Sequence, residues 1–163
     1  MTPIHYTVLD LETTGFSPGR GDRIVEVGIV RLDEDGRVVD EYESLVNPQR
    51  DVGATHVHGI TAEMVAGAPL FTQVKDSVLD LLRDSVVVSH NAGFDLRFLN
   101  HELRQSAAHL PEIDGLCTLR LSRLVAPNLP SRKLHHLCEY FDIPLENAHT
   151  ALADSRATAE LFR

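Results

Sequence analysis

Two carboxylates stand two residues apart near the start of the chain. Asp10 and Glu12 lie in an apolar, β-rich segment that ends at Thr13-Thr14-Gly15. Side chains two positions apart on a β-strand project to the same face, so both carboxylates would point in one direction. Crowded carboxylates repel each other unless a cation lies between them, and hard oxygen ligands suit Mg²⁺ or Mn²⁺. The pattern indicates a divalent-metal site, with a solvated strand end and its turn-forming threonines as an equal alternative.

A third carboxylate follows a short run of valines. Asp95 comes shortly after His90 and Asn91, which follow the apolar segment 86–88. Ligands of α/β sheets bind at the carboxyl ends of strands, which favours a functional role for this segment. However, the helix dipole alone also favours an aspartate in a first helical turn. Taken alone, the segment fits a simple helix start slightly better.

The last such pair is His149 and Asp154, close to the end of the chain. At about 100° per residue, five residues leave the two side chains on flanking faces of a helix. Both can border one site if His149 sits where the helix begins, and Ala151 and Ala153 would let that helix approach its neighbours closely. By itself, a histidine near a helix start is more commonly polar surface.

The elements that must position these residues change in type along the chain. Alternating apolar residues and a short valine run predict strands over 4–11, 24–32, 37–46 and 86–88. Helical spacing and capping residues predict helices after Thr61, over 71–82 and 96–103, within 111–126 behind a short element at Leu116-Cys117, after Ser131, and from about His149. A strand meander followed by alternating helices and strands predicts an α/β fold with a mixed five-stranded sheet flanked by helices.

One of these helices carries a more detailed prediction. Ser131 is expected to be its N-cap, with Leu134, Leu137 and Phe141 among its inward residues. The run from Ser131 to His136 is also the one compact basic segment near the expected site, so Arg132 and Lys133 are candidates for phosphate contacts. A solvated helix start is nearly as good an interpretation of the run.

The composition is that of one globular domain. The chain has 163 residues, of which 43% are hydrophobic and 24% charged. No apolar run approaches the roughly 20 residues of a membrane span, and no secretory leader is recognisable, so we expect a cytoplasmic protein with no membrane partner. Cys117 and Cys138 lack CxxC spacing and are expected to be free, buried thiols. The last helix runs to Arg163 without an end signal, which points to a single domain, 1–163, taken from a longer chain.

The charge balance limits how a polyanion can be held. Fifteen basic residues stand against 24 acidic ones, a net charge of -9. A basic footprint over the whole surface, of the kind that binds duplex nucleic acid, is therefore excluded. A polyanionic substrate would have to be held locally or through metal ions.

Taken together, the three segments resemble the three motifs of the DEDDh 3′-to-5′ exonucleases. The matching patterns are Asp10-x-Glu12-Thr13-Thr14-Gly15, His90-Asn91-x-x-Phe94-Asp95 and His149-x-Ala151-x-x-Asp154. This DnaQ-like family includes the proofreading epsilon subunit of bacterial DNA polymerase III. The likeness covers essentially the whole chain, and a histidine five residues before Asp154 selects the histidine branch. It implies an RNase H-like fold.

The resemblance implies a two-metal mechanism for phosphodiester hydrolysis. Asp10, Glu12 and Asp154 would bind one Mg²⁺ or Mn²⁺ ion, Asp10 would also bind a second, and Asp95 would reach that second ion through water. Two such ions stabilise the attacking and leaving oxygens of the displacement. His149 is the expected general base, because an imidazole exchanges protons near neutral pH.

The resemblance also implies contacts to the terminal nucleotides. The residues expected to bind substrate are Thr13, Thr14, Gly15, His58, Asn91 and Phe94. Thr13 and the loop behind it would meet the terminal sugar hydroxyl, and His58 and Phe94 would flank the bases. Core packing is an equally good interpretation of Phe94.

The expected function is the release of nucleoside 5′-monophosphates from DNA 3′ ends in proofreading, replication or repair. The expected partners are single-stranded DNA 3′ ends and a DNA polymerase subunit or a covalently linked domain. Because basic surface is scarce, we expect only the last few unpaired nucleotides to be recognised. Two alternatives remain: the same chemistry on RNA, which differs by its 2′-hydroxyl, and a non-catalytic interaction module, which the complete acidic set argues against.

Overall fold

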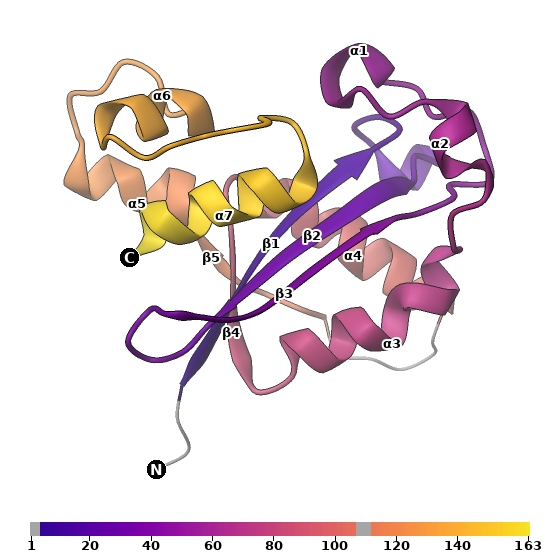
Figure 1. Ribbon diagram of the computed structural model, residues 1–163, viewed down its shortest axis with the longest axis horizontal. Helices are drawn as coiled ribbons and strands as arrows, with labels where there is room; N and C mark the ends of the chain where they lie inside the picture. The colour runs from indigo at the N-terminus through magenta and orange to yellow at the C-terminus, as the bar shows by residue number, and fades with distance from the viewer. Residues whose placement is uncertain (1–3, 107–111) are drawn as a thin grey trace.

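A five-stranded mixed sheet forms the centre of the molecule (Figure 1). The computed structural model describes residues 4–106 and 112–163. The strands, in the spatial order β3-β2-β1-β4-β5, are β1 (His5–Thr13), β2 (Ile24–Leu32), β3 (Val38–Leu45), β4 (Ser85–Ser89) and β5 (Leu116–Cys117). β3, β2 and β1 pair antiparallel with one another, whereas β4 is parallel to β1 and β5 is parallel to β4. The predicted meander with added parallel strands is therefore confirmed.

Seven α-helices and one 3₁₀ turn are present in the described residues. They are η1 (Pro18–Arg20), α1 (Thr55–His58), α2 (Ala62–Ala66), α3 (Phe71–Leu82), α4 (Ala92–Ser106), α5 (Thr118–Val125), α6 (Leu134–Tyr140) and α7 (Ala151–Phe162). Pro111, the first residue of one predicted segment, lies outside the described residues. Within 4–106 and 112–163, no helix combines the length and the apolar character that crossing a membrane requires.

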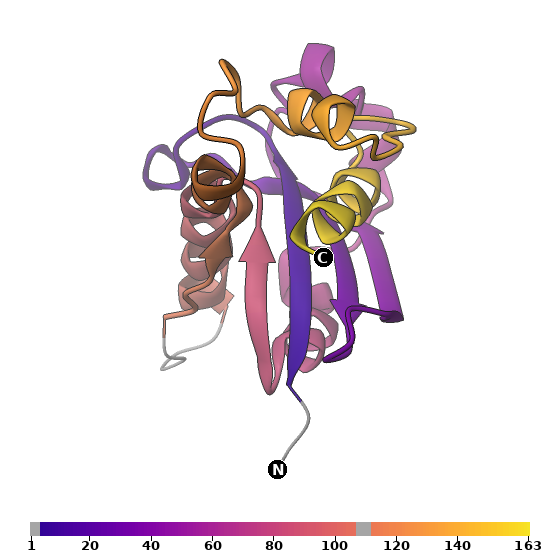
Figure 2. The same ribbon diagram turned by 90° about the vertical axis from the view of Figure 1, so that its left-hand side faces the viewer.

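The helices cover the sheet in two layers because β1 is apolar on both faces. Leu9 and Leu11 belong to a buried cluster that includes Phe71 of α3 and Phe98 of α4. Residues on the opposite face, with Val8 among them, form a second cluster with Ala159 of α7. Figure 2 shows α7 lying against one face of the sheet and α4 behind the other. Asp10 and Glu12 follow Val8 in the alternation, so they face the α7 layer.

The N-terminal end of α7 lies directly on the backbone of β2. Gly28 is the register partner of Asp10 on the neighbouring strand. A Cβ atom at Gly28 would overlap the backbone of Ala151 and Leu152, so only glycine leaves room for this approach. The Ser155 hydroxyl donates a 2.9 Å hydrogen bond to the Gly28 carbonyl and fixes the helix there. The close contact places the first turn of α7 beside the end of β1.

The helix expected after Ser131 begins later than predicted. Its N-cap is Lys133, which has an extended backbone. The carbonyl of the preceding residue, Arg132, accepts a 2.9 Å hydrogen bond from His90 Nε2. That bond holds the segment before Lys133 out of helical conformation, and Ser131 Oγ lies 2.6 Å from His136 Nδ1 instead of capping. Phe141, expected to point inward, is 40% exposed because α6 ends at Tyr140. Both details of the prediction were wrong.

The contact at Gly28 gives a stability prediction. Gly28→Ala should lower the free energy of unfolding by about 1–3 kcal/mol, because the added methyl group must displace the start of α7. Urea unfolding measures the change. Gly19→Ala is the matched control, since a Cβ there meets no atom within 4 Å. Equal stability of the two variants would contradict the proposed close approach.

Candidate metal and nuclease site

Three carboxylates from the two ends of the chain meet at the end of β1. Asp10 and Glu12 come from β1, and Asp154 lies in the first turn of α7. Each offers one oxygen within 4.8 Å of the other two, and all three side chains are partly buried. The predicted alternation on β1 and the approach of α7 at Gly28 together produce this cluster.

Asp95 lies beside the cluster but outside this close group of three. It is 3% exposed and sits in the first turn of α4. One carboxylate oxygen accepts a 3.1 Å hydrogen bond from the Leu11 amide, and the other accepts a 2.6 Å hydrogen bond from the Ser89 hydroxyl. These bonds fix Asp95 against the ends of both β1 and β4.

The pKa values of the four carboxyl groups are raised by burial and by the charges of their neighbours. Burial raises the pKa of Asp10 well above its ordinary value, and the charges of Asp95, Asp154 and Glu12 raise it further. Burial and the charge of Asp154 raise the pKa of Glu12 to about 8. Burial also raises the pKa of Asp95, to about 7, despite its hydrogen bonds. Such a group of oxygens cannot be fully ionised at neutral pH without a cation, and its hard donors fit a divalent ion such as Mg²⁺ or Mn²⁺.

His149 lies beside Asp154 in front of α7. The helix begins at Ala151, so His149 is not its first residue as predicted but part of the preceding turn, with a φ of 70°. Its backbone amide donates a 3.4 Å hydrogen bond to Asp154 Oδ1. Burial raises the pKa of Asp154, and this bond from His149 partly offsets the rise. His149 is exposed to solvent, and its charge also lowers the pKa of Asp154.

Glu26 is a part of this arrangement that the sequence reasoning missed. It is 7% exposed on β2, opposite Glu12, and its Oε2 accepts a 2.8 Å hydrogen bond from the Ala151 amide at the first turn of α7. Burial raises its pKa. An acidic residue in the otherwise apolar run 24–30 was the available signal. Glu26 holds the start of the helix that carries Asp154.

The loop after β1 is shaped by its own side chains. Thr13 Oγ1 donates a 2.7 Å hydrogen bond to the Gly15 carbonyl. Thr14 Oγ1 donates to Asp22 at 3.2 Å and accepts from the Arg23 amide at 3.1 Å. Both threonines are buried, and their hydroxyl protons are used in hydrogen bonds within the loop.

The other predicted substrate residues lie in different settings. His58 is buried, its Nδ1 accepts a hydrogen bond from the Ile60 amide, and its Nε2 has no partner among the described residues. Phe94 packs on Phe98, with ring centroids 5.1 Å apart. Asn91 is exposed, with a φ of 64°, at the loop between β4 and α4.

In the basic run after Pro130, Arg132 forms hydrogen bonds within its own loop. The guanidinium group of Arg132 donates hydrogen bonds to the carbonyl groups of Leu129, Ala126 and Pro127 at 2.9 to 3.1 Å. Its donors therefore hold the loop before α6 together. These bonds weigh against a phosphate contact by Arg132, whereas the role of the exposed Lys133 stays a prediction.

Comparison with known proteins gives consistent similarities. Residues 7–162 match the family RNase_T, described as exonuclease. The chain is 37% identical to the DNA polymerase III PolC-type of Clostridium perfringens, covering 97% of this chain and 11% of that protein. It is 34% identical to the DNA polymerase III subunit epsilon of Rickettsia felis, covering 99% and 74%. The nuclease domain of 3′hExo, a DEDDh family member bound to rAMP, has a similar fold, with a TM-score of 0.80, 21% identity and coverage of 99% and 90%.

The raised pKa values predict how stability depends on pH and metal. Without divalent cations, the folded state binds more protons than the unfolded chain between the ordinary carboxyl pKa and the raised values of about 7 and about 8. Stability should therefore fall as the pH rises from about 5 to about 8. Mn²⁺ should reverse the fall, by about 2.7 kcal/mol at roughly 100 times its Kd. Urea unfolding with chelator or Mn²⁺ at both pH values measures this.

The matched control for that experiment is Asp10→Asn with Glu12→Gln. This variant should flatten the pH dependence and abolish the response to Mn²⁺. Stability of the unmodified chain that rises with pH in chelator would contradict the electrostatic account.

Glu26 gives a separate prediction. Glu26→Ala should lower the free energy of unfolding by about 1 kcal/mol and weaken Mn²⁺ binding, because the Ala151 amide loses its acceptor and the start of α7 is released. Glu26→Gln keeps a carbonyl oxygen at that place and should restore both. Urea unfolding and calorimetric Mn²⁺ titration measure the two effects, with Glu34→Ala in an exposed turn as control. Failure of the glutamine variant to recover either would refute the positioning role.

Proposed function

Because the chain belongs to the RNase_T exonuclease family, in its DEDDh type, we propose that it removes nucleotides from the 3′ ends of single-stranded DNA and releases nucleoside 5′-monophosphates. Membership makes the chain a nuclease hydrolase and confirms the family resemblance of its three motifs. The observation that carries the proposal is the meeting of Asp10, Glu12 and Asp154 within 4.8 Å, with His149 beside them.

Two divalent cations, Mg²⁺ or Mn²⁺, are the proposed cofactors. Asp10, Glu12 and Asp154 would hold one ion, and Asp10 would be shared with a second. Both oxygens of Asp95 already accept hydrogen bonds from the protein, which favours an indirect role through water for this residue. When bound, such ions stabilise the attacking and leaving oxygens of a phosphodiester displacement.

His149 is the proposed general base. Its exposed side chain lies where water can reach the carboxylate cluster, and its backbone is tied to Asp154. An imidazole in this place would accept the proton of the attacking water and return it to solvent. General bases typically contribute about 10²–10⁴-fold to the rate.

The loop after β1, with His58 and Phe94, is the proposed binding site of the terminal nucleotide. The oxygen of the Thr13 hydroxyl keeps acceptor capacity after donating to Gly15, so it can accept from a sugar hydroxyl. His58 lies beside the backbone of Thr13, and its ring is the proposed flank of a base. The partly exposed Phe94 offers a ring on which a base can stack, an interaction worth about 1–3 kcal/mol.

DNA is the proposed substrate because the relatives reported above are DNA polymerase III proteins. The chain spans about a tenth of the PolC-type relative and about three quarters of the epsilon relative. We therefore propose a role in replication proofreading or repair, in which a polymerase subunit or a linked domain delivers the 3′ end. RNA is the competing substrate.

A direct assay tests these assignments. A 5′-labelled single strand, as DNA and as RNA, is incubated with Mg²⁺, Mn²⁺ or chelator, and the shortened products are resolved by length. Stepwise shortening of DNA only in the presence of metal is expected. Equal or faster shortening of RNA would mean that RNA is the substrate in place of DNA. Digestion in chelator would refute the metal mechanism.

Variants then test the residues. Asp10→Asn and Asp154→Asn should abolish detectable hydrolysis, and His149→Ala should lower the rate about 10²–10⁴-fold while Mn²⁺ still binds. Asp40→Asn and His101→Ala, which lie outside the site, are the matched controls and should retain full activity. Substantial activity in the Asp10 or Asp154 variant would exclude that residue as an essential metal ligand.

A further inference from the structure

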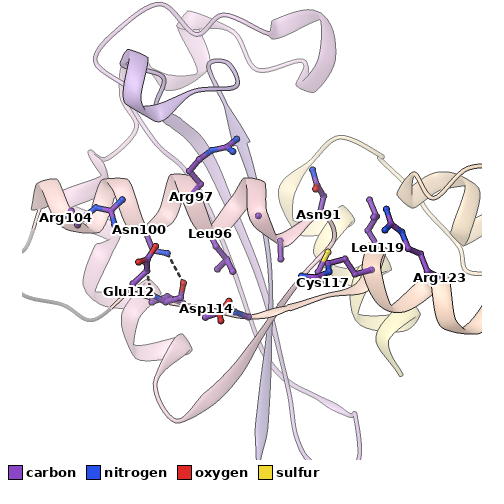
Figure 3. Close-up of a pocket in the computed structure, with 15 residues that line it drawn as sticks. Asn91, Leu96, Arg97, Asn100, Arg104, Glu112, Asp114, Cys117, Leu119 and Arg123 are labelled. Carbon is purple, nitrogen blue, oxygen red and sulfur yellow. Dashed lines mark hydrogen bonds between the residues drawn. The ribbon is translucent and has the colours of Figure 1, made fainter.

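A groove beside the carboxylate site is lined by four arginines. It has a volume of about 840 Å³ and lies between α4 and α5 at the β5 edge of the sheet (Figure 3). Arg97 and Arg104 project from α4, and Arg120 and Arg123 belong to α5. All four side chains are exposed. The sequence showed no cluster here, because the arginines come from two helices separated by β5.

These arginines differ from many of the other basic residues in having no acidic partner. Within 4–106 and 112–163, seven basic side chains form ion pairs with carboxylates: Arg23, Arg37, Arg50, Lys75, Arg83, Arg156 and Arg163. None of the four groove arginines forms an ion pair with a described carboxylate. Even with the two acidic residues of the lining, Glu112 and Asp114, four positive charges against two leave a net charge of +2 in a chain of -9.

One end of the groove lies at the start of α4, the helix that carries Asp95. Asn91, at the loop between β4 and α4, lines its near end, and the next turn of α4 carries Asp95. Arg97 is tied to the loop after β1, because its guanidinium donates to the Phe16 carbonyl at 3.1 Å and lies over the Phe94 ring. Arg104 lies seven residues further, about 10 Å along the helix axis. Positive charge therefore extends along α4 away from the carboxylates.

The polar groups of the groove supply positive charge but few free donors or acceptors for base-specific hydrogen bonds. The side chain of Asn100 donates to the Ile113 carbonyl and accepts from the Ile113 amide, each at 2.8 Å, so its amide is already used. Exposed guanidinium groups bind phosphate oxygens, and phosphate contacts carry no sequence information. The fitting ligand is a polynucleotide backbone of any sequence.

We propose that this groove binds the phosphates of the single strand upstream of its 3′ end, while the terminal nucleotide lies at the carboxylates. The inference rests on the proposed nuclease function and extends it by assigning a second contact region on the substrate. It also revises the expectation from net charge that only the last few nucleotides are held. Affinity should therefore grow with strand length and fall with salt.

The test compares two double variants that change the net charge equally. Arg104→Ala with Arg123→Ala removes two groove charges, whereas Arg37→Ala with Arg83→Ala removes two ion-paired charges at the far end of the sheet. Arg97 is left intact because it contacts Phe94. Fluorescence anisotropy in chelator measures binding of a labelled oligothymidylate trinucleotide and of one with about fifteen nucleotides, a length in the range of single-strand sites.

The groove variant should bind the long strand about tenfold more weakly at low salt. Its log–log salt slope should decrease by about 1.4, or about 0.7 for each phosphate that an arginine no longer neutralises. Its binding of the trinucleotide should not change, and the control variant should match the unmodified chain on both. Equal behaviour of the two double variants, an equal weakening on short and long strands, or no length dependence in the unmodified chain would each overturn the inference.

The outcome is separable from that of the nuclease assay. Binding in chelator does not require cleavage, so an unmodified chain that cleaves nothing but shows the expected groove effect would refute the nuclease proposal alone. A chain that digests DNA while the groove and control variants bind alike would refute the groove alone.

Discussion

The close approach of α7 to the backbone of β2 is the contact on which the site depends. Gly28 gives the helix room, the Ser155 hydroxyl binds the Gly28 carbonyl, and Glu26 accepts from the Ala151 amide. Because Gly28 and Glu26 are the register partners of Asp10 and Glu12, the same contact that seats the helix also sets the distance from Asp154 to both. One packing arrangement thus joins the two ends of the chain into one cluster.

That cluster is unfavourable for the protein alone, so the surrounding structure must hold it. Burying like charges raises the pKa of each carboxyl group and lowers the stability of the ionised site. Opposing forces come from elsewhere: apolar clusters on both faces of the sheet, and the ion pair of Arg23 with the buried Glu102, at 2.6 Å, which joins the start of β2 to α4. A preformed cluster of this kind has an affinity for divalent cations that separate, solvated carboxylates would not have.

Features that follow from the periodicity of a strand or helix could be predicted from the sequence. Features that depend on contacts between distant elements were missed. Alternation placed Asp10 and Glu12 on one face, and helix-start chemistry placed Asp95 in the first turn of α4, as the structure has them. The start of α7 was predicted two residues early, since nothing in the neighbouring sequence indicates the turn at His149. Glu26 was missed because a buried glutamate on a strand has meaning only once the partner helix is known.

Net charge alone describes this chain poorly as a binder of polyanions. The value of -9 includes carboxylates that would be neutralised by bound cations and others that neutralise seven of the basic residues, so the potential at any place depends on local pairing. The proposed cation site lies at the start of α4, and the arginine groove runs along the same helix. A strand attracted to both would be oriented along the helix with its end at the carboxylates, whereas a uniformly basic surface would hold it in many directions. The order of charges along α4, with carboxylates at its start and arginines further along, would set the direction in which a single strand binds.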